Sequence, residues 1–259
     1  MQLGFIGTGE ITSSIVTGLS SFGVPRHSIW LSPRNSAIAT RLANRFHGVS
    51  VASSNQEVLD RSDTLLITVK PSVTRDVLSE LAFRPDHMVI SLVSALSLHA
   101  LSELVAPCVR IARAVPLPSA ARRLSPTAIY PADQTALELF AEVGSVFPSE
   151  TENEFDAICS TTATIASFFA FTEAIASWLE EKGVPATQAR PYIGRLFLGV
   201  TTGAVESPTQ SFQSLASTHA TAGGINEQFL KHLVEHRFLI TVSEALDAVL
   251  HRIRTQSQL

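Results

Sequence analysis

The chain lacks the sequence patterns expected of metal centres, disulfide frameworks and membrane spans. Only two of its 259 residues are cysteine, Cys108 and Cys159, and neither has metal-ligand spacing, so we expect two reduced thiols in the core and no metal. The most apolar stretch, around Ile158–Ile175, is interrupted by Ser, Thr and Glu173, which argues against a membrane. Basic residues are scattered and the formal net charge is −4, which argues against a nucleic-acid partner. The chain opens directly on a strand, without room for a signal peptide, so we expect a cytoplasmic protein.

A glycine turn follows the first apolar strand. Leu3–Ile6 has the pattern of a buried strand, and Ile11–Leu19 has that of an amphipathic helix. Gly7 allows the tight turn between them, and Gly9 lets the backbone approach a pyrophosphate at the helix N-terminus. This pattern predicts a dinucleotide site. The cofactor-binding residues expected here are Gly7, Thr8, Gly9, Glu10 and Ile11.

Short apolar strands alternate with helices through the first half of the chain. The strands are expected at 28–32, 49–51, 64–69, 88–93 and 109–112, with possible edge strands at 127–130 and 144–147. Near-continuous apolar strands separated by helices of about ten residues are typical of a parallel sheet covered on both faces. We therefore predict an α/β fold, with a doubly wound parallel-sheet (Rossmann) domain over residues 1–151.

The second half, residues 152–259, has a helical pattern and predicts an all-helical dimerisation and substrate domain. One long helix is expected over Glu152–Lys182, ended by Gly183 and Pro185. Further helices are expected at 186–206, 209–215, 225–235 and 238–254, and 255–259 is expected to be disordered. Thr161–Ala176 carries apolar or small residues on most faces. Such a helix usually packs against another subunit, so we expect a homodimer or a higher homo-oligomer formed through these helices.

Residues that follow three other strands complete the expected cofactor site. Ser32 and Arg34 follow the second strand, and without a nearby Asp they suit a ribose 2′-phosphate, which favours NADPH over NADH; a solvated surface arginine is the alternative. The segment Val69, Lys70 and Pro71 lies at the carboxyl end of a buried strand, where ligands bind in open sheets. Ser94 and Ala95 follow the next strand and are small enough to admit a nicotinamide.

The order of these motifs resembles the pyrroline-5-carboxylate reductase family. The matching segments include Gly4–Gly9, Ser32–Arg34, Asn55–Glu57, Val69–Pro71, Ile90–Ser97, Gly183–Pro185 and Thr221–Gly224. The resemblance implies that Asn55 contacts the adenosine half of the cofactor, although a turn or helix N-cap role is equally compatible with it. It also implies that Thr221 and Asn226 are the catalytic residues that position the substrate.

Several substrate segments depart from the family pattern. At Arg113–Pro116 the family's Asn and Thr are missing, and Thr161–Ser167 keeps hydroxyls but lacks the family's glycine, proline and tyrosine. Asn226 stands where the family has a substrate-binding Thr. The guanidinium of Arg113 offers paired N–H donors that suit a substrate carboxylate. Alternatively, Arg113 is an ion-pair partner at an interface.

The leading hypothesis is an NADPH-dependent reductase that transfers hydride to a small cyclic imine acid such as 1-pyrroline-5-carboxylate, giving proline. A cyclic iminium is already activated by its charge, so this reaction needs no strong general acid. Two alternatives remain: a reductase of a different imine or carbonyl substrate, and a non-catalytic NADP-binding dimer. NADH is retained as the alternative cofactor.

Overall fold

The computed structural model describes residues 1–21, 23 and 26–256. Its contacts divide the chain into two units. The first unit comprises Met1–Ser160 together with the C-terminal residues from Leu250, and the second unit comprises Thr161–Val249. Each unit is described separately below.

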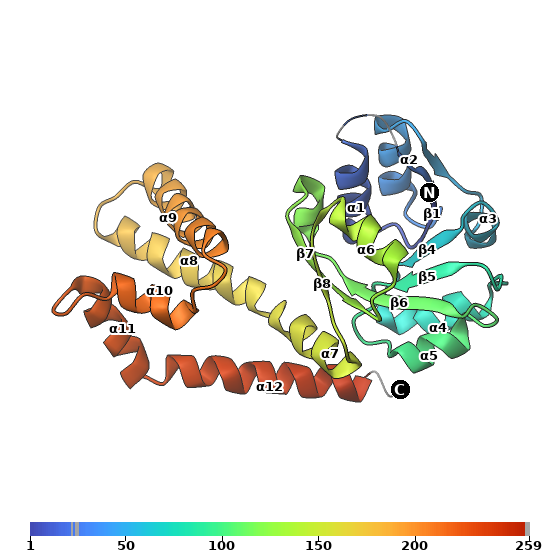
Figure 1. Ribbon diagram of the computed structural model, residues 1–259. Helices are drawn as coiled ribbons and strands as arrows, with labels where there is room; N and C mark the ends of the chain where they lie inside the picture. The colour runs from blue at the N-terminus through green and yellow to red at the C-terminus, as the bar shows by residue number, and fades with distance from the viewer. Residues whose placement is uncertain (22, 24–25, 257–259) are drawn as a thin grey trace. The chain divides into compact units, whose positions relative to one another are not determined.

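The first unit is built around one eight-stranded sheet with the order β3-β2-β1-β4-β5-β6-β7-β8 (Figure 1). The strands are β1 (Gln2–Ile6), β2 (Ser28–Leu31), β3 (Val49–Val51), β4 (Thr64–Ile67), β5 (Met88–Ser91), β6 (Arg110–Val115), β7 (Ser125–Tyr130) and β8 (Gly144–Pro148). Strands β1 to β6 are mutually parallel. This is the strand order of a dinucleotide-binding domain. The direction in which successive strands are added to the sheet reverses between β1 and β4. The predicted fold class is confirmed.

Helices cover both faces of the sheet (Figure 1). They are α1 (Glu10–Ser20), α2 (Ser36–Arg45), α3 (Asn55–Asp60), α4 (Pro71–Ser79), α5 (Leu98–Leu104) and α6 (Gln134–Ala141). Successive side chains of β1 alternate between the two faces, so Leu3 and Phe5 join the core under α1, α2 and α6, while Ile6 joins the core under α3, α4 and α5. The central strands β1, β4 and β5 have no solvated face, which explains their continuous apolar sequence.

The far edge of the sheet departs from the all-parallel expectation. The predicted edge strands exist as β7 and β8, but β7 runs antiparallel to β6, with Arg113 opposite Tyr130, and β8 runs parallel to β7. A short 3-10 helix, η1 (Pro118–Arg122), makes the reversal after β6. The sequence analysis predicted neither η1 nor α6. Asp133 begins α6 by accepting hydrogen bonds from the N–H groups of Thr135 and Ala136.

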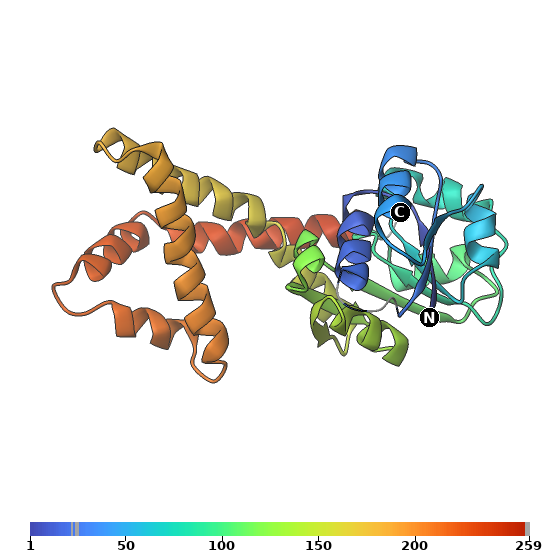
Figure 2. The same cartoon turned by 90° about the horizontal axis from the view of Figure 1, so that it is seen from above.

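The helical part of the chain contains α7 (Glu152–Thr161), α8 (Thr164–Glu181), α9 (Ala186–Glu206), α10 (Phe212–His219), α11 (Ile225–Glu235) and α12 (Phe238–Gln256). Helix α7 belongs to the first unit, where Phe155 and Cys159 pack with Ala128 of β7 and Ile253 of α12. In both views, the helices of the second unit are spread out rather than closed into a compact bundle (Figure 1, Figure 2).

The prediction of a single helix over Glu152–Lys182 is wrong in one respect, because the helix is interrupted between α7 and α8. The break lies in the sequence Thr161-Thr162-Ala163-Thr164, where the Thr164 hydroxyl donates to the Thr161 carbonyl at 2.7 Å. Threonine hydroxyls compete with the helix for backbone carbonyls, and three of them within four residues favour an interruption.

Two further boundaries differ from expectation. The helix expected at 209–215 begins at Phe212 and ends at His219, because Ser211 is its N-cap and accepts from the N–H of Ser214. Helix α12 extends to Gln256, so the disorder expected from Thr255 does not begin there. Residues 257–259 lie outside the described residues. The helices expected at 186–206 and 225–235 are confirmed at those bounds.

Candidate functional site

The glycine turn between β1 and α1 has the geometry of a phosphate-binding turn. Gly7 has φ +106°, and a Cβ there would lie 2.8 Å from the Thr68 carbonyl carbon, so no larger residue fits without strain. Gly9 is the N-cap of α1, with φ −103° and open space where its Cβ would lie. The first N–H groups of a helix lack intrahelical partners, so this open space lies at a set of donors suited to a pyrophosphate.

Hydroxyl groups hold the turn in place. Thr12 stands at the third fingerprint position and is fully buried; its hydroxyl lies 2.9 Å from both the Gly7 carbonyl oxygen and the Thr68 hydroxyl. The Thr68 hydroxyl in turn lies 2.6 Å from the Gly7 carbonyl. From the next strand, Ser32 Oγ accepts from the N–H of Gly7 at 2.9 Å. The Thr8 hydroxyl donates to the Ser32 carbonyl at 2.8 Å. Sequence reasoning missed Thr68, although a hydroxyl directly after a buried strand is the signal that could have found it.

The exposed residues expected to contact the cofactor follow the carboxyl ends of the parallel strands. Glu10 is exposed in the first turn of α1, where the helix dipole stabilises an acid. Arg34 is exposed after β2, and its guanidinium forms no hydrogen bond or ion pair within the described part of the chain. Lys70 is the exposed N-cap residue of α4 and Pro71 is its first residue. Because parallel strands end at one edge of a sheet, these residues share the edge with the glycine turn.

Other expected cofactor residues have half-buried side chains. Val69 packs against the core under α3, α4 and α5. Asn55 is the first residue of α3, and the N-cap is Ser54, whose Oγ accepts from the N–H of Glu57 at 3.1 Å. The alternative N-cap role of Asn55 is therefore wrong, and its half-buried side chain has no capping role. Ile11 is also half-buried and packs against the other core.

The Ser94–Ala95 segment is tied to a buried ion-pair cluster. Arg113 of β6 is 1% exposed; its Nη1 lies 2.7 Å from Glu152 Oε1 and 2.9 Å from Asp156 Oδ1, and its Nη2 donates to the Ser94 carbonyl at 3.2 Å. The guanidinium carbon also lies 4.5 Å from the centroid of the Phe155 ring. Arg113 is thus engaged within its own unit and is not the free carboxylate-binding fork that the sequence suggested.

Sequence reasoning did not single out the acids of this cluster. Glu152 and Asp156 are spaced i, i+4 at the start of α7, and such a pair on a helix otherwise rich in apolar residues is the signal that could have found them. The adjacent thiol of Cys159 is buried, and burial raises the pKa of Cys159 to about 12. Cys108 is also buried, and burial raises its pKa. Both cysteines are free, as expected.

The candidate substrate-positioning residues lie close together in the second unit: Thr221 is in the turn between α10 and α11, and Asn226 is in the first turn of α11. The Asn226 amide donates to the His219 carbonyl at 3.2 Å, and the Thr221 carbonyl accepts from the N–H of Gly224 at 2.8 Å. A Cβ at Gly224 would lie 2.7 Å from the Thr221 hydroxyl, so the turn requires glycine there. One of the two N–H groups of the Asn226 side-chain amide is therefore already used to close the turn.

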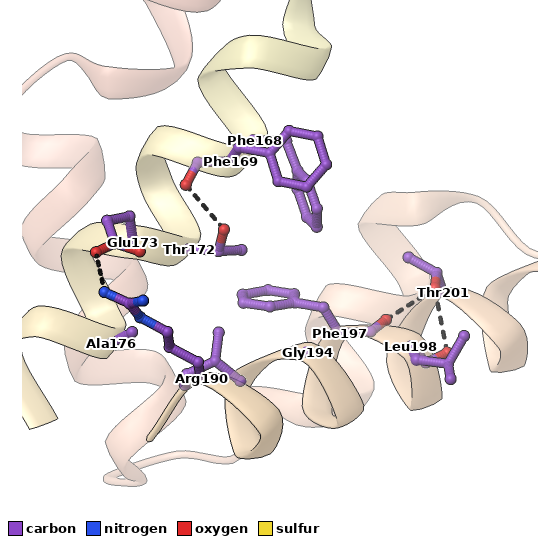
Figure 3. A pocket seen from close by; sticks show the side chains of 11 residues that line it. Phe168, Phe169, Thr172, Glu173, Ala176, Arg190, Gly194, Phe197, Leu198 and Thr201 are labelled. Carbon is purple, nitrogen blue, oxygen red and sulfur yellow. Dashed lines mark hydrogen bonds and ion pairs between the residues drawn. The ribbon is translucent and has the colours of Figure 1, made fainter. Parts of the chain in front are cut away.

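Two apolar grooves run along α8. The first, of about 400 Å³, lies between α8 and α9; Phe168 and Phe169 come from α8 and Phe197 comes from α9, with the Arg190–Glu173 ion pair at one side (Figure 3). The second, of about 690 Å³, lies between α8 and α12 and has an almost entirely apolar lining. By length and composition alone, Glu152–Glu181 is apolar enough to cross a membrane, even though Ser, Thr and Glu173 interrupt it. Its alanine, isoleucine and phenylalanine outweigh the interrupting polar residues.

Comparisons with known proteins match each part of the chain. Residues 2–95 match the family described as "NADP oxidoreductase coenzyme F420-dependent", and residues 152–256 match "Pyrroline-5-carboxylate reductase dimerisation". The pyrroline-5-carboxylate reductase of Vibrio alginolyticus is 25% identical over 100% of this chain and 98% of its own length. The crystal structure of 1-pyrroline-5-carboxylate reductase from Streptococcus pyogenes is 25% identical, with a TM-score of 0.85, and covers 100% of this chain and 99% of that one.

A third comparison supports the fold alone. The Plasmodium falciparum pyrroline carboxylate reductase, solved with NADP bound, is 19% identical, with a TM-score of 0.81, over 99% of this chain and 98% of that one. The fold and the glycine turn define an oxidoreductase with a dinucleotide-binding domain and a separate helical region. More narrowly, the chain belongs to the pyrroline-5-carboxylate reductase family.

Proposed function

We propose that the protein reduces 1-pyrroline-5-carboxylate to proline with NADPH. The observation that carries this proposal is the end-to-end similarity to a curated relative of that name, which covers 100% of this chain and 98% of the relative. A reductase of this kind needs a cofactor edge and a substrate region. The glycine turn offers the first, and the region that contains Thr221 and Asn226 is the candidate for part of the second.

The residues at the sheet edge fit NADPH. Gly7 and Gly9 leave the N-terminus of α1 open to a pyrophosphate, and the exposed guanidinium of Arg34 is available for the 2′-phosphate. Asn55 would lie toward the adenosine half, whereas Lys70, Ser94 and Ala95 would lie toward the nicotinamide half, because they follow strands on opposite sides of the reversal in strand order.

The chemistry is the conversion of a C=N bond to an amine. When bound, NADPH would supply the hydride that adds to the imine carbon, and the ring nitrogen of the protonated imine keeps its proton. The protein's own residues orient the two reactants and exclude water, which is sufficient for a substrate activated by its own charge. Thr221 and Asn226 are proposed to position the substrate.

We further propose that the protein is a cytoplasmic homodimer assembled through α8 and α12. The match of residues 152–256 to a dimerisation family supports this arrangement, and so does the exposed apolar lining of the grooves on α8. A second copy would cover the same apolar length that satisfies the criteria for a membrane helix. Light scattering coupled to gel filtration without detergent tests this proposal: a dimer supports it, and aggregates that only detergent disperses would refute it.

The decisive test of function is NADPH oxidation by the purified protein with 1-pyrroline-5-carboxylate, with NADH in a parallel series. Rapid oxidation that prefers NADPH, with proline as the product, supports the proposal. NADPH binding without turnover of any imine would instead favour a non-catalytic NADP-binding dimer.

A reductase of a different imine or carbonyl is the second candidate. Thr161–Ser167 has no glycine to bring backbone close to a carboxylate, and one of the two amide N–H groups of Asn226 is engaged by the His219 carbonyl. Turnover of another imine or a carbonyl compound, but not of 1-pyrroline-5-carboxylate, would favour this candidate.

A further inference from the structure

The buried cluster around Arg113 joins the segment after β5 to helix α7. Arg113 Nη2 donates to the Ser94 carbonyl, while Glu152 Oε1 accepts from Arg113 Nη1 and also from the backbone N–H of Leu98 at 2.7 Å. Glu152 therefore contacts Leu98, the first residue of α5, while Arg113 contacts Ser94, so the cluster holds both ends of the segment 94–98. The exposed Ser94 keeps its side chain at the sheet edge while its carbonyl faces the guanidinium.

We propose that Arg113 and Glu152 are positioning residues that hold the segment 94–98 in the conformation that accepts the nicotinamide half of the cofactor. This inference rests on the proposed function, because it requires that the protein binds NADPH. It does not depend on which imine the protein reduces. Charge-assisted hydrogen bonds are shorter and stronger than neutral ones, and a buried cluster leaves little freedom to the groups it contacts. The segment is thereby fixed before any ligand arrives.

Asp156 provides a matched control within the same cluster. Glu152 and Asp156 each give one oxygen to Arg113 Nη1, so removal of either leaves the guanidinium with one acid. Only Glu152 also accepts from the N–H of Leu98. Asp156 is the more buried acid, with a side chain 8% exposed against 33% for Glu152. A purely structural role therefore predicts that loss of Asp156 is the more damaging change in every measurement.

The positioning role predicts the opposite order for NADPH affinity: loss of Glu152 should be the more damaging change. In Glu152→Ala, we expect the dissociation constant of NADPH to rise about tenfold, as for the loss of one charge-assisted hydrogen bond, and Asp156→Ala should raise it less. Hydrogen exchange of the peptide that spans residues 92–101, in the protein without cofactor, should be faster in Glu152→Ala than in Asp156→Ala. Glu152→Gln keeps an acceptor for Leu98 and should restore slow exchange and most of the NADPH affinity.

NADPH affinity is measured by titration of cofactor fluorescence, and thermal unfolding checks that each variant is folded. An equal or larger loss of NADPH affinity and of protection in Asp156→Ala would overturn the inference, as would a failure of Glu152→Gln to rescue. If Glu152→Ala does not fold, Glu152→Asp, whose shorter side chain withdraws the acceptor from the N–H of Leu98, takes its place in the comparison with Asp156→Ala. Neither measurement needs a substrate, so a protein that never reduces 1-pyrroline-5-carboxylate would refute the proposed activity and leave this result intact.

Discussion

The two units of the chain differ in how far they bury their apolar side chains. In the first unit, residues such as Phe5, Leu66 and Phe140 are fully buried in cores on both faces of the sheet. In the described residues 161–249, the buried apolar side chains are Ala176, Ala189 and Ile193. Large residues there remain in water: Phe169 is 65% exposed and Phe229 is 55% exposed. Exposed apolar surface of this extent marks an interaction site, so the first unit stabilises itself whereas the second unit depends on a partner.

The largest effect should come from a cavity in the first unit. Phe140→Ala should lower the free energy of unfolding by about 3–5 kcal/mol, because it removes a fully buried ring. Phe212, which is 82% exposed on α10, is the matched control, and its change to alanine should cost less than about 0.5 kcal/mol. Urea unfolding followed by circular dichroism measures both. Similar losses of unfolding free energy in the two variants would contradict the difference in packing between the two units.

Substitutions at two glycines should separate an effect on NADPH binding from an effect on the stability of the first unit. Gly9→Val should reduce NADPH affinity by about 2–3 kcal/mol, because its side chain would occupy the open space in front of the helix N–H donors, while an extended backbone tolerates valine. Gly7→Ala should instead destabilise the fold by about 1–3 kcal/mol, because φ is +106° there. Titration calorimetry and thermal unfolding distinguish the two. Unchanged NADPH affinity in Gly9→Val would rule out the assigned turn.

A charge placed on α8 tests the dependence of the second unit on a partner. Phe168 lines both grooves and is 44% exposed. Phe168→Asp should weaken self-association by about 2 kcal/mol, roughly 30-fold in the dissociation constant, because the interface would bury an unpaired carboxylate. Sedimentation velocity over a range of concentrations measures this constant. Phe212→Asp, outside both grooves, should leave it unchanged; equal dissociation by both variants would contradict the proposed interface.

The smallest effect concerns an exposed residue of the first unit. Arg34→Ala should weaken NADPH binding by about 1.5 kcal/mol, roughly tenfold, and leave NADH affinity unchanged, because only NADPH carries a 2′-phosphate. Fluorescence titration with each cofactor is sufficient. An equal loss for both cofactors would exclude a 2′-phosphate role for Arg34.

The elements predicted well are those whose sequence pattern is local. The apolar strands of the first unit and the helices α9 and α11 could be placed because strand and helix periodicity is visible within a few residues. The antiparallel direction of β7 was not predictable, since pairing with β6 is a long-range choice. The break before α8 was missed because it depends on a competition between threonine hydroxyls and helix hydrogen bonds.

The sequence by itself determined the glycine turn and the apolar strands, because turn geometry and burial follow from residue types in their immediate neighbourhood. Tertiary structure alone decided the role of Arg113. A guanidinium can bind a substrate carboxylate or a protein carboxylate, and only the packing of α7 beside β6 brings Glu152 and Asp156 within 2.9 Å of it. The engagement of Asn226 with the His219 carbonyl was decided in the same way, because the length and curvature of the turn determine which acceptor its amide meets.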